Sequence, residues 1–484
     1  MYTDPESIAK KWSSFKDNIV ALSSWALSMK EQPLEIDYLL VQTPGSVMPK
    51  AKASFWQKLI HETKAFLASF TEDYTSLGSI YGNEAPVVWV QAGTSGRDQA
   101  QVLKNMVDND FTPRTGIPVN IQLVNGGILL SATLAGQGPD VALHAGGSDP
   151  VNYALRNAVA DLRQFEDFEE VAAQFYDASL VPFEINGGVY ALPETMSFPV
   201  MFYRADILQD LGVGIPQTWE EFYEAVSVIQ KKNLDVGLPV GNAGALLQCY
   251  CMLLMQQGGQ LYTDDGTSTA LLTETAINAF QDWTALFSDY KLPVTYDFAN
   301  RFRTGEMPLA IADYTQYNYL SVFAPEIKGL WGFTLVPGYK RDGGIDRTAP
   351  VSVSATILME QSKKKESSWE FIKWWLSADA QQEYGNNLEN ILGISGRLAT
   401  ANKSAMEMLP WSDKDIRVLK AQLEYVAGIP EIAGGYFTSR HINNAFYKVY
   451  NANENPRQVL EDYALVINKE ITNKRKEFGL PAAE

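Results

Sequence analysis

Few residue patterns in the chain could carry out catalysis. The carboxyl groups of Glu194 and Asp313 could serve as acid and base in a glycosidase, but the sequence does not show their separation. His61-Glu-Thr-Lys-Ala65 begins like a zinc-protease helix and lacks the second histidine of that motif. Gly93-Thr-Ser-Gly-Arg97 lacks the final glycine of a nucleophile elbow. We therefore expect no catalytic residues and do not expect an enzyme.

Cofactor and metal motifs are also missing from the sequence. It contains no Gly-x4-Gly-Lys-[Ser/Thr] phosphate loop, and no dinucleotide glycine motif follows the first predicted strand. Cys249 and Cys251 are two residues apart, a spacing that suits neither a disulfide nor, with three scattered histidines, a zinc site. Buried thiols are the favoured interpretation. We expect no cofactor and no metal.

The charge of the chain excludes two classes of partner. Of its 484 residues, 57 are acidic and 39 are basic, which gives a net charge of −18. Nucleic-acid binding and anionic-membrane binding both depend on clustered lysine and arginine, so neither is expected. No apolar stretch reaches the roughly 18 residues that span a bilayer, and the first residues do not resemble a signal peptide. A cytoplasmic protein and a trimmed exported protein both remain open.

Residues 1–84 have a pattern of their own. Apolar residues recur at spacings of three or four between Ile8 and Met29, which predicts an amphipathic helix. A strand is predicted at 36–42 and a second helix from Phe55 to Phe70. Apolar faces as rich as these must pack against something, so we expect a helical appendage packed on the main body or on another domain.

Strands and helices alternate after Pro86. Strands are predicted at 87–90, 118–124 and 139–143, with helices at 97–110 and 128–134 between them. This order predicts a parallel sheet covered by helices on both faces. Ligands of such sheets bind beyond the carboxyl ends of the strands, which favours the loops at 93–96 and 144–149 as binding loops. Further helices are predicted at 219–229, 243–255, 274–288 and 368–376.

Several later segments carry motifs that occur together in one family. Asn186-Gly-Gly-Val-Tyr-Ala-Leu-Pro193 is followed by a hydrophobic segment ending in Tyr203-Arg-Ala-Asp206, and then by Ile215-Pro-Gln-Thr-Trp-Glu-Glu-Phe222. Further matches occur at 138–141, 302–307, 335–338 and 363–381. Together they resemble the family 1 extracellular solute-binding proteins of ABC importers, the carbohydrate-type group similar to maltose-binding protein. Arg204 stands where that family usually has asparagine.

The resemblance implies an α/β fold of the type II periplasmic-binding-protein kind, with two lobes joined by a hinge and an N-terminal helical appendage. Residues 1–84 would be the appendage. The first lobe would comprise 85–195 and 314–375, and the second 196–313 and 376–484. Residues 1–84 also look similar to a helical region of unusually large lipoproteins of this family, so we expect the chain to be the carboxyl-terminal part of such a protein.

The same resemblance, together with the predicted loops, identifies candidate ligand-binding residues. Tyr314 and Tyr317 are the strongest candidates for rings that stack on a sugar, with ordinary packing on a helix face as the alternative. Each remaining candidate also has a structural alternative, such as a helix cap, a loop contact or core packing. These candidates are Thr94, Ser95, Arg97, His144, Ser148, Asp149, Glu194, Ser197, Asn242, Asp313, Trp331, Arg397, Tyr436 and Phe437.

The implied function is capture of a carbohydrate, expected to be an oligosaccharide, and its delivery to a membrane permease by hinge closure. The ATPase would be a separate chain, which agrees with the missing phosphate loop. We expect a monomer at the cell surface, lipid-anchored in the full-length protein. The alternatives are a receptor of the same fold for a non-sugar ligand, a sensor, or a carbohydrate-active enzyme.

Overall fold

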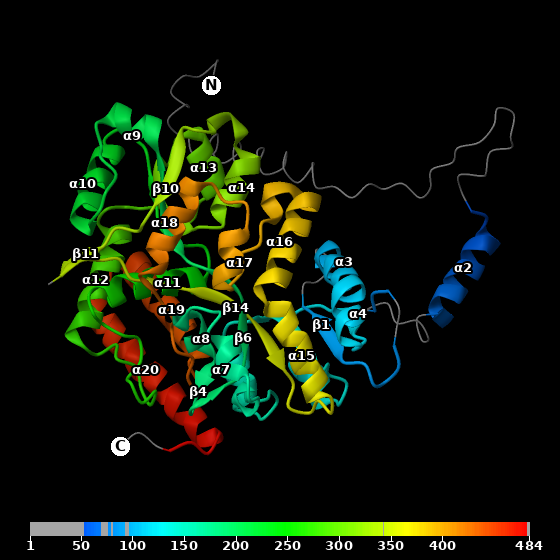
Figure 1. Ribbon diagram of the computed structural model, residues 1–484. Coiled ribbons are helices and arrows are strands. Elements are labelled where there is room, and N and C mark those ends of the chain that lie inside the picture. Colours follow the sequence, from blue (N-terminus) through cyan, green and yellow to red (C-terminus); the bar gives the residue numbers. More distant parts are fainter. Residues whose placement is uncertain (1–52, 69–75, 79–80, 92–95, 342, 482–484) are drawn as a thin grey trace, which may run out of the picture. The chain divides into compact units, whose positions relative to one another are not determined.

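The computed structural model describes residues 53–68, 76–78, 81–91, 96–341 and 343–481 (Figure 1). The chain divides into two compact units, Met1–Thr75 and Ser76–Glu484. In the first unit the structure describes one helix, α2 (Phe55–Ala68), where the sequence predicted a helix to residue 70. Its apolar residues, including Phe55 and Trp56, are exposed. The helix predicted at 8–29 and the strand predicted at 36–42 lie outside the described residues.

The second unit begins earlier than the predicted boundary after residue 84. The backbone N–H of Leu77 donates a hydrogen bond of 3.0 Å to the carbonyl of Ile121. The N–H of Tyr81 donates to the side-chain oxygen of Asn120 at 2.7 Å. The short segment that holds Leu77 and Tyr81 has no hydrophobic periodicity. Its attachment to the edge of the sheet therefore could not be predicted from the sequence.

A five-stranded sheet with the order β2-β1-β3-β14-β6 forms the first lobe. β1, β2 and β3 are parallel as predicted, whereas β14 is antiparallel to both of its neighbours. The strands are β1 (Val87–Val90), β2 (Asn120–Leu123), β3 (Val141–Gly146), β6 (Leu192–Ser197) and β14 (Ser352–Leu358). The helices are α3 (Arg97–Met106), α4 (Thr112–Thr115), α5 (Leu129–Leu134), α6 (Asp149–Ala154), α7 (Phe168–Ala172), α8 (Asp177–Leu180), α15 (Lys365–Leu376), α16 (Ala378–Leu392) and α17 (Lys403–Met408). The next helix, α18 (Asp413–Leu423), contacts β10 of the second lobe.

Both faces of this sheet are buried, as the uninterrupted apolar strands require. Val88 and Val90 face a core that also holds Leu103 of α3 and Trp375 of α15. The neighbouring residue Trp89 points to the opposite face, in a smaller core with residues of α5 and α6. Successive strand residues alternate between faces, so helices on both sides are needed to cover them. The predicted layers are therefore confirmed.

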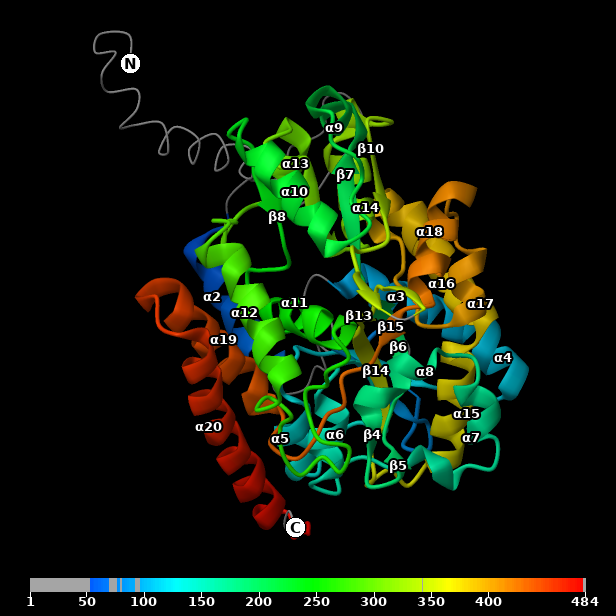
Figure 2. The same ribbon diagram turned by 90° about the vertical axis from the view of Figure 1, so that its left-hand side faces the viewer.

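A four-stranded sheet with the order β10-β7-β9-β8 forms the second lobe. Figures 1 and 2 both show this sheet and its helices α9, α10, α13 and α14 at one end of the second unit. The strands are β7 (Pro199–Arg204), β8 (Val236–Gly237), β9 (Leu309–Asp313) and β10 (Trp331–Thr334). The helices are α9 (Ala205–Leu211), α10 (Trp219–Gln230), α11 (Ala243–Gln256), α12 (Glu274–Ser288), α13 (Phe298–Thr304), α14 (Gln316–Phe323), α19 (Tyr436–Ala452) and α20 (Pro456–Glu477).

The chain crosses between the lobes at Phe198, the single residue between β6 and β7. The chain goes back to the first lobe later than residue 314, the predicted point. The reason is that β10 still pairs with β7 in the second lobe, with Trp331 opposite Arg204. The return is therefore between β10 and β14. A short strand such as β10 fits either sheet by composition, so the sequence could not assign it. Likewise α16 packs against α3 of the first lobe, although residues 376–484 were predicted in the second.

Short hairpins and bridges complete the connections. β4 (Glu184–Ile185) pairs with β5 (Gly188–Val189), and β11 (Tyr339–Arg341) pairs with β12 (Gly344–Asp346). β13 (Ala349–Pro350) runs parallel to β15 (Val426–Ala427). The last pair brings the segment that returns to the first lobe beside the segment that leads to α19.

The start of α10 is capped by Thr218. The hydroxyl of Thr218 accepts a hydrogen bond of 3.3 Å from the N–H of Glu221. Replacing Thr218 by alanine should lower the free energy of unfolding by about 1 kcal/mol, because that N–H then has no partner. Urea unfolding followed by tryptophan fluorescence measures the change. Thr218→Ser keeps the acceptor and should lose less than half as much; an equal loss in both variants would contradict the cap.

Candidate ligand-binding cleft

Two neighbouring hollows share the first turns of α11 as a common wall. The first, which we call the interlobe hollow, has a volume of about 450 Å³ and is lined by residues of both lobes. The second, the second-lobe hollow, has a volume of about 430 Å³. Asn242, Ala245 and Gln248 line both hollows. We refer to the two hollows together as the cleft, and their volumes suit a small-molecule ligand.

The walls of the interlobe hollow come from segments far apart in the sequence. Gly147 and Ser148 follow β3 of the first lobe, and Ser352 begins β14. The amide of Gln248, on α11, donates a hydrogen bond to the hydroxyl of Ser352. Asn242 caps α11 by accepting from the N–H of Ala245 at 2.9 Å. The hollow is thus lined by hydroxyl and amide groups that can pair with a polar ligand.

Asp313 lies in the second-lobe hollow at the end of β9, as predicted for a ligand-binding residue. Its carboxyl group accepts from the N–H of Thr315 at 2.9 Å and from the Thr315 hydroxyl at 2.6 Å. Burial raises the pKa of Asp313, although hydrogen bonds from Ser197 and Thr315 oppose the rise. The predicted residue Ser197 therefore acts on the cleft through Asp313.

A pair of acidic residues lies at the interlobe hollow. Glu431 lines that hollow, and Asp149 follows the lining residue Ser148. Burial, and then the charge of Asp149, raise the pKa of Glu431 to about 7. Burial also raises the pKa of Asp149, opposed by a hydrogen bond from the N–H of Gly146. Glu431 therefore takes up a proton more readily than a free carboxyl group and ionises as the pH rises through about 7.

This raised pKa predicts a pH-dependent stability. Between the ordinary value of 4.5 and the folded value of about 7, the folded state holds a proton on Glu431 that the unfolded state has released. The stabilisation from this group is complete below pH 4.5 and is lost as the pH rises through 7. Glu431→Gln should therefore gain stability over the unmodified protein by on the order of 1 kcal/mol between pH 5 and 8. Urea titrations across that range measure the difference, and a pH-independent difference would contradict the assignment.

Aromatic rings line the second-lobe hollow. Tyr319, on α14, is 42% exposed, and its ring stacks with that of Phe323 at a centroid distance of 5.2 Å. Tyr296 lines the same hollow, and its hydroxyl donates to the carbonyl of Leu238 at 2.5 Å. Phe298 completes the apolar part of this wall. Such rings can stack against the apolar faces of a ligand.

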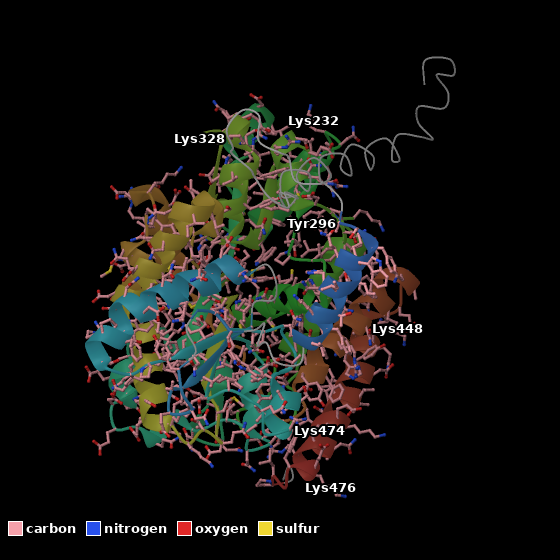
Figure 3. All side chains as sticks on the ribbon, turned by 90° about the vertical axis from the view of Figure 1, so that its right-hand side faces the viewer. Lys232, Tyr296, Lys328, Lys448, Lys474 and Lys476 are labelled. Carbon is pink, nitrogen blue, oxygen red and sulfur yellow. The ribbon has the colours of Figure 1, made fainter. Side chains whose placement is uncertain are left out.

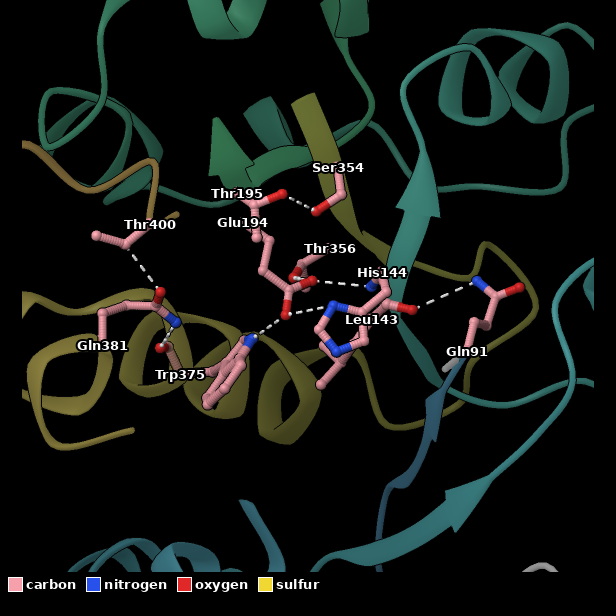
Figure 4. A network of polar contacts seen from close by, with 10 residues as sticks. All are labelled: Gln91, Leu143, His144, Glu194, Thr195, Ser354, Thr356, Trp375, Gln381 and Thr400. Carbon is pink, nitrogen blue, oxygen red and sulfur yellow. Dashed lines mark hydrogen bonds and ion pairs between the residues drawn. The ribbon is translucent and has the colours of Figure 1, made fainter. Parts of the chain in front are cut away.

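The predicted residues His144 and Glu194 belong to a polar network, drawn in Figure 4. Glu194 is 2% exposed and accepts from the N–H of His144 at 2.8 Å, the indole of Trp375 at 3.1 Å and the hydroxyl of Thr356 at 3.3 Å. Burial lowers the pKa of His144, but the charge and hydrogen bond of Glu194 outweigh it, so the net pKa is raised. These contacts hold β3, β6, β14 and α15 together.

The predicted stacking residues Tyr314 and Tyr317 do not line the cleft. Tyr314 is 2% exposed, and its hydroxyl donates to the carbonyl of Met196, so in this structure its ring packs in the core. Tyr317 and Trp331 line a separate hollow of about 300 Å³. Arg397 is buried near it, with two hydrogen bonds to Glu389 and its guanidinium 4.6 Å from the ring of Trp411. The structure does not bring these four residues to the cleft.

The remaining predicted residues that the structure describes do not line the two hollows. Thr94 and Ser95 lie outside the described residues, and Arg97 is exposed at the first turn of α3. Tyr436 and Phe437 begin α19 with their ring centroids 4.1 Å apart. Neither ring lines the two hollows, although Ser439 on the same turn does.

Sequence reasoning missed Gln248, Ser352, Tyr319 and Glu431. Gln248 precedes the buried Cys249 in a helix whose pattern indicates core, and nothing in that pattern marks one polar residue as facing a cleft. Tyr319 could have been found, because Tyr317 and Tyr319 are two apart and point to different sides of a helix.

Metal-ligating and thiol groups also occur in the described part of the chain. Within it, no cluster of three or more histidine, cysteine, aspartate or glutamate residues is arranged for a metal ion. Cys249 and Cys251 are free and buried, as predicted, and burial raises the pKa of Cys249 to about 12. The helices in this part are too short or too polar to cross a bilayer.

Comparison with known proteins agrees with this architecture. A family model described as bacterial extracellular solute-binding protein matches residues 93–382. A binding protein of Brucella abortus (strain 2308) is 23% identical over 363 residues, which are 72% of this chain and 84% of the relative. The arabinooligosaccharide-binding protein of Bacillus subtilis (strain 168) is 22% identical over 264 residues, 52% of this chain and 56% of that protein.

A solved structure shares the fold. The sugar-binding protein MalE from Xanthomonas citri superimposes with a TM-score of 0.69 at 17% sequence identity. The match covers 82% of this chain and 100% of that protein. The two-lobed architecture derived from the sheets is therefore that of a periplasmic binding protein.

Proposed function

The chain belongs to the bacterial extracellular solute-binding protein family, and we propose that its cleft binds a carbohydrate, in particular an oligosaccharide. The observation that carries this proposal is the composition of the cleft. Hydroxyl, amide and carboxyl groups of Ser352, Gln248 and Asp313 line it together with the rings of Tyr296 and Tyr319. Sugars present both hydroxyl groups and apolar C–H faces, and such a wall matches both.

The size of the cleft supports a ligand larger than one sugar ring. Its two hollows have volumes of about 450 and 430 Å³ and share the α11 residues Ala245 and Gln248. A micromolar dissociation constant needs a net binding free energy of only about −8 kcal/mol. A few hydrogen bonds and one or two stacked rings supply a free energy of that size.

Binding would be coupled to closure of the lobes. The chain crosses between the lobes at Phe198, between β10 and β14, and again between α17 and α19, so three segments connect the lobes and can act as a hinge. A ligand that contacts both lobes favours the closed state by the free energy of the additional contacts. We propose that the closed complex delivers the ligand to ABC permease subunits, with a lipid anchor on the full-length protein at the cell surface.

Thermal unfolding in the presence of glycans tests this proposal. The full chain is screened against oligosaccharides of different linkage, and hits are confirmed by calorimetry. A carbohydrate ligand should raise the melting temperature progressively with its concentration, because it binds only the folded state. Mass analysis should show the ligand unchanged after incubation. A screen without any binding would refute the carbohydrate proposal, and cleaved product would show an enzyme.

A further inference from the structure

We propose that the cleft prefers a glycan that carries a free amino group, bound with its ammonium ion against Glu431 and beside Asp149. This inference rests on the proposed carbohydrate function and names the class of sugar. It follows from the charges that line the cleft, from the lack of a partner for Glu431 among the described residues, and from the position of Glu431 between two hollows.

The cleft is lined by acidic residues without a basic residue among them. Asp297 and Asp313 line the second-lobe hollow, and Glu431 lines the interlobe hollow. No lysine or arginine is among the described residues that line either hollow. Figure 3 shows the labelled lysines at α19, α20 and the far end of the second lobe, away from Tyr296. An anionic sugar would meet uncompensated negative charge here, whereas a cation would relieve it.

The carboxyl groups at the cleft differ in whether they already accept hydrogen bonds from the protein. Asp313 accepts two hydrogen bonds from Thr315, and Asp297 accepts one from the N–H of Asn300 at 3.1 Å, capping α13. Asp149 accepts from the N–H of Gly146 at 3.1 Å. Glu431 alone among these four has no hydrogen bond or ion pair to any described residue, although it is partly buried. A partly buried carboxyl group of this kind is stabilised by a donor that a ligand brings.

Among the described residues, the basic residue that shares a hollow with Glu431 makes its hydrogen bonds elsewhere. Glu431 also lines a third hollow of about 600 Å³ on the side of α20, where Arg475 is the basic residue. The guanidinium of Arg475 donates to the carbonyls of Pro481 and Gly266, so it is committed elsewhere. The nearby acidic residues Asp149 and Glu184 add negative charge. An ammonium ion at this point would meet Glu431 directly and lower the repulsion between it and Asp149.

A neutral sugar would gain less at the same place. A hydroxyl group can donate to Glu431, but it leaves the negative charge of the pair uncompensated. An ammonium group donates up to three hydrogen bonds and brings the opposite charge into a partly buried position, where charges interact more strongly than in water. The geometry therefore points to discrimination by charge among sugars of equal size.

Calorimetry on the full chain with matched sugars tests the inference. The probes are glucose, glucosamine and glucuronate, the corresponding galactose series, and the β-1,4-linked dimers cellobiose and chitosan dimer, at pH 7. The amino sugar of the preferred series should bind at least about tenfold more tightly than its neutral counterpart, and the uronate more weakly than either. In about 0.5 M salt the amino preference should shrink, because screening weakens charge pairs.

Variants locate the effect at Glu431. Glu431→Gln keeps the shape and should reduce the amino-over-neutral ratio at least fivefold while neutral sugars still bind. Asp210→Asn, an exposed acid on α9 remote from the cleft lining, is the matched control and should leave the ratio unchanged. The inference is overturned if the amino-over-neutral affinity ratio is near one in the unmodified protein, or if the preference is unchanged in Glu431→Gln. In either case, binding of neutral sugars would still support the proposed function. Spermidine binding as tightly as the amino sugar overturns the glycan requirement, and no binding of any sugar refutes both proposals.

Discussion

Replacing Glu194 by alanine should lower the free energy of unfolding by about 3 to 5 kcal/mol. The carboxyl group accepts from the backbone N–H of His144, the indole of Trp375 and the hydroxyl of Thr356. Alanine leaves all three donors inside the first lobe without an acceptor, and each unsatisfied buried donor costs about 1 to 3 kcal/mol. It also removes the partner of the His144 imidazole, which lies 3.1 Å from the carboxyl group.

Urea unfolding of the full chain at pH 7, followed by tryptophan fluorescence, measures this loss. Glu194→Gln is the matched variant, because its amide oxygen retains one acceptor while its NH2 group faces a donor, so it should lose about half as much. Glu184→Ala removes an exposed acid of the same lobe and should change stability by less than about 0.5 kcal/mol. A loss below about 1 kcal/mol in Glu194→Ala would show that the donors find other partners.

The alternation of strands and helices could be predicted because it follows from local periodicity. The strand at 87–90 and the helix at 274–288 have the predicted bounds in the structure, where they are β1 and α12. Pairing partners do not follow from periodicity. The antiparallel insertion of β14 between β3 and β6 joins residues about 200 positions apart, as Ser354 and Gly146 show. The sequence of a strand does not show which sheet the strand joins. For the same reason, the point at which the chain returns to the first lobe was predicted too early, at residue 314.

The candidate site was predicted less completely than the fold. Ser148, Asn242 and Asp313 line the cleft because the loops after strands and the starts of helices face it, and that rule can be applied to a sequence. Glu194 shows the limit of the rule. It lies on β6 near the crossing, but its carboxyl group turns into the lobe and binds three donors. Which way a strand residue points depends on register, which is set by partners distant in sequence.

The two tyrosines of α14 should separate ligand binding from packing. Tyr319→Ala should weaken binding of the carbohydrate identified by the glycan screen by about 1 to 2 kcal/mol, or five- to thirtyfold in Kd. Its ring is 42% exposed and lines the second-lobe hollow, so the loss falls on the ligand more than on the fold. Tyr317→Ala should lower stability by about 2 to 4 kcal/mol instead. Its ring packs at centroid distances of 5.6 Å from Trp331 and 5.3 Å from Trp411.

Calorimetry and urea unfolding on both variants distinguish the two roles. Tyr319→Phe keeps the ring and should bind within about twofold of the unmodified protein, because stacking on a sugar face depends on the ring and not on the hydroxyl. Tyr317→Phe should likewise recover most of the lost stability. If Tyr317→Ala weakens binding without loss of stability, while Tyr319→Ala leaves the affinity unchanged, the ligand occupies the hollow lined by Tyr317 and Trp331, and the second-lobe hollow is not its site.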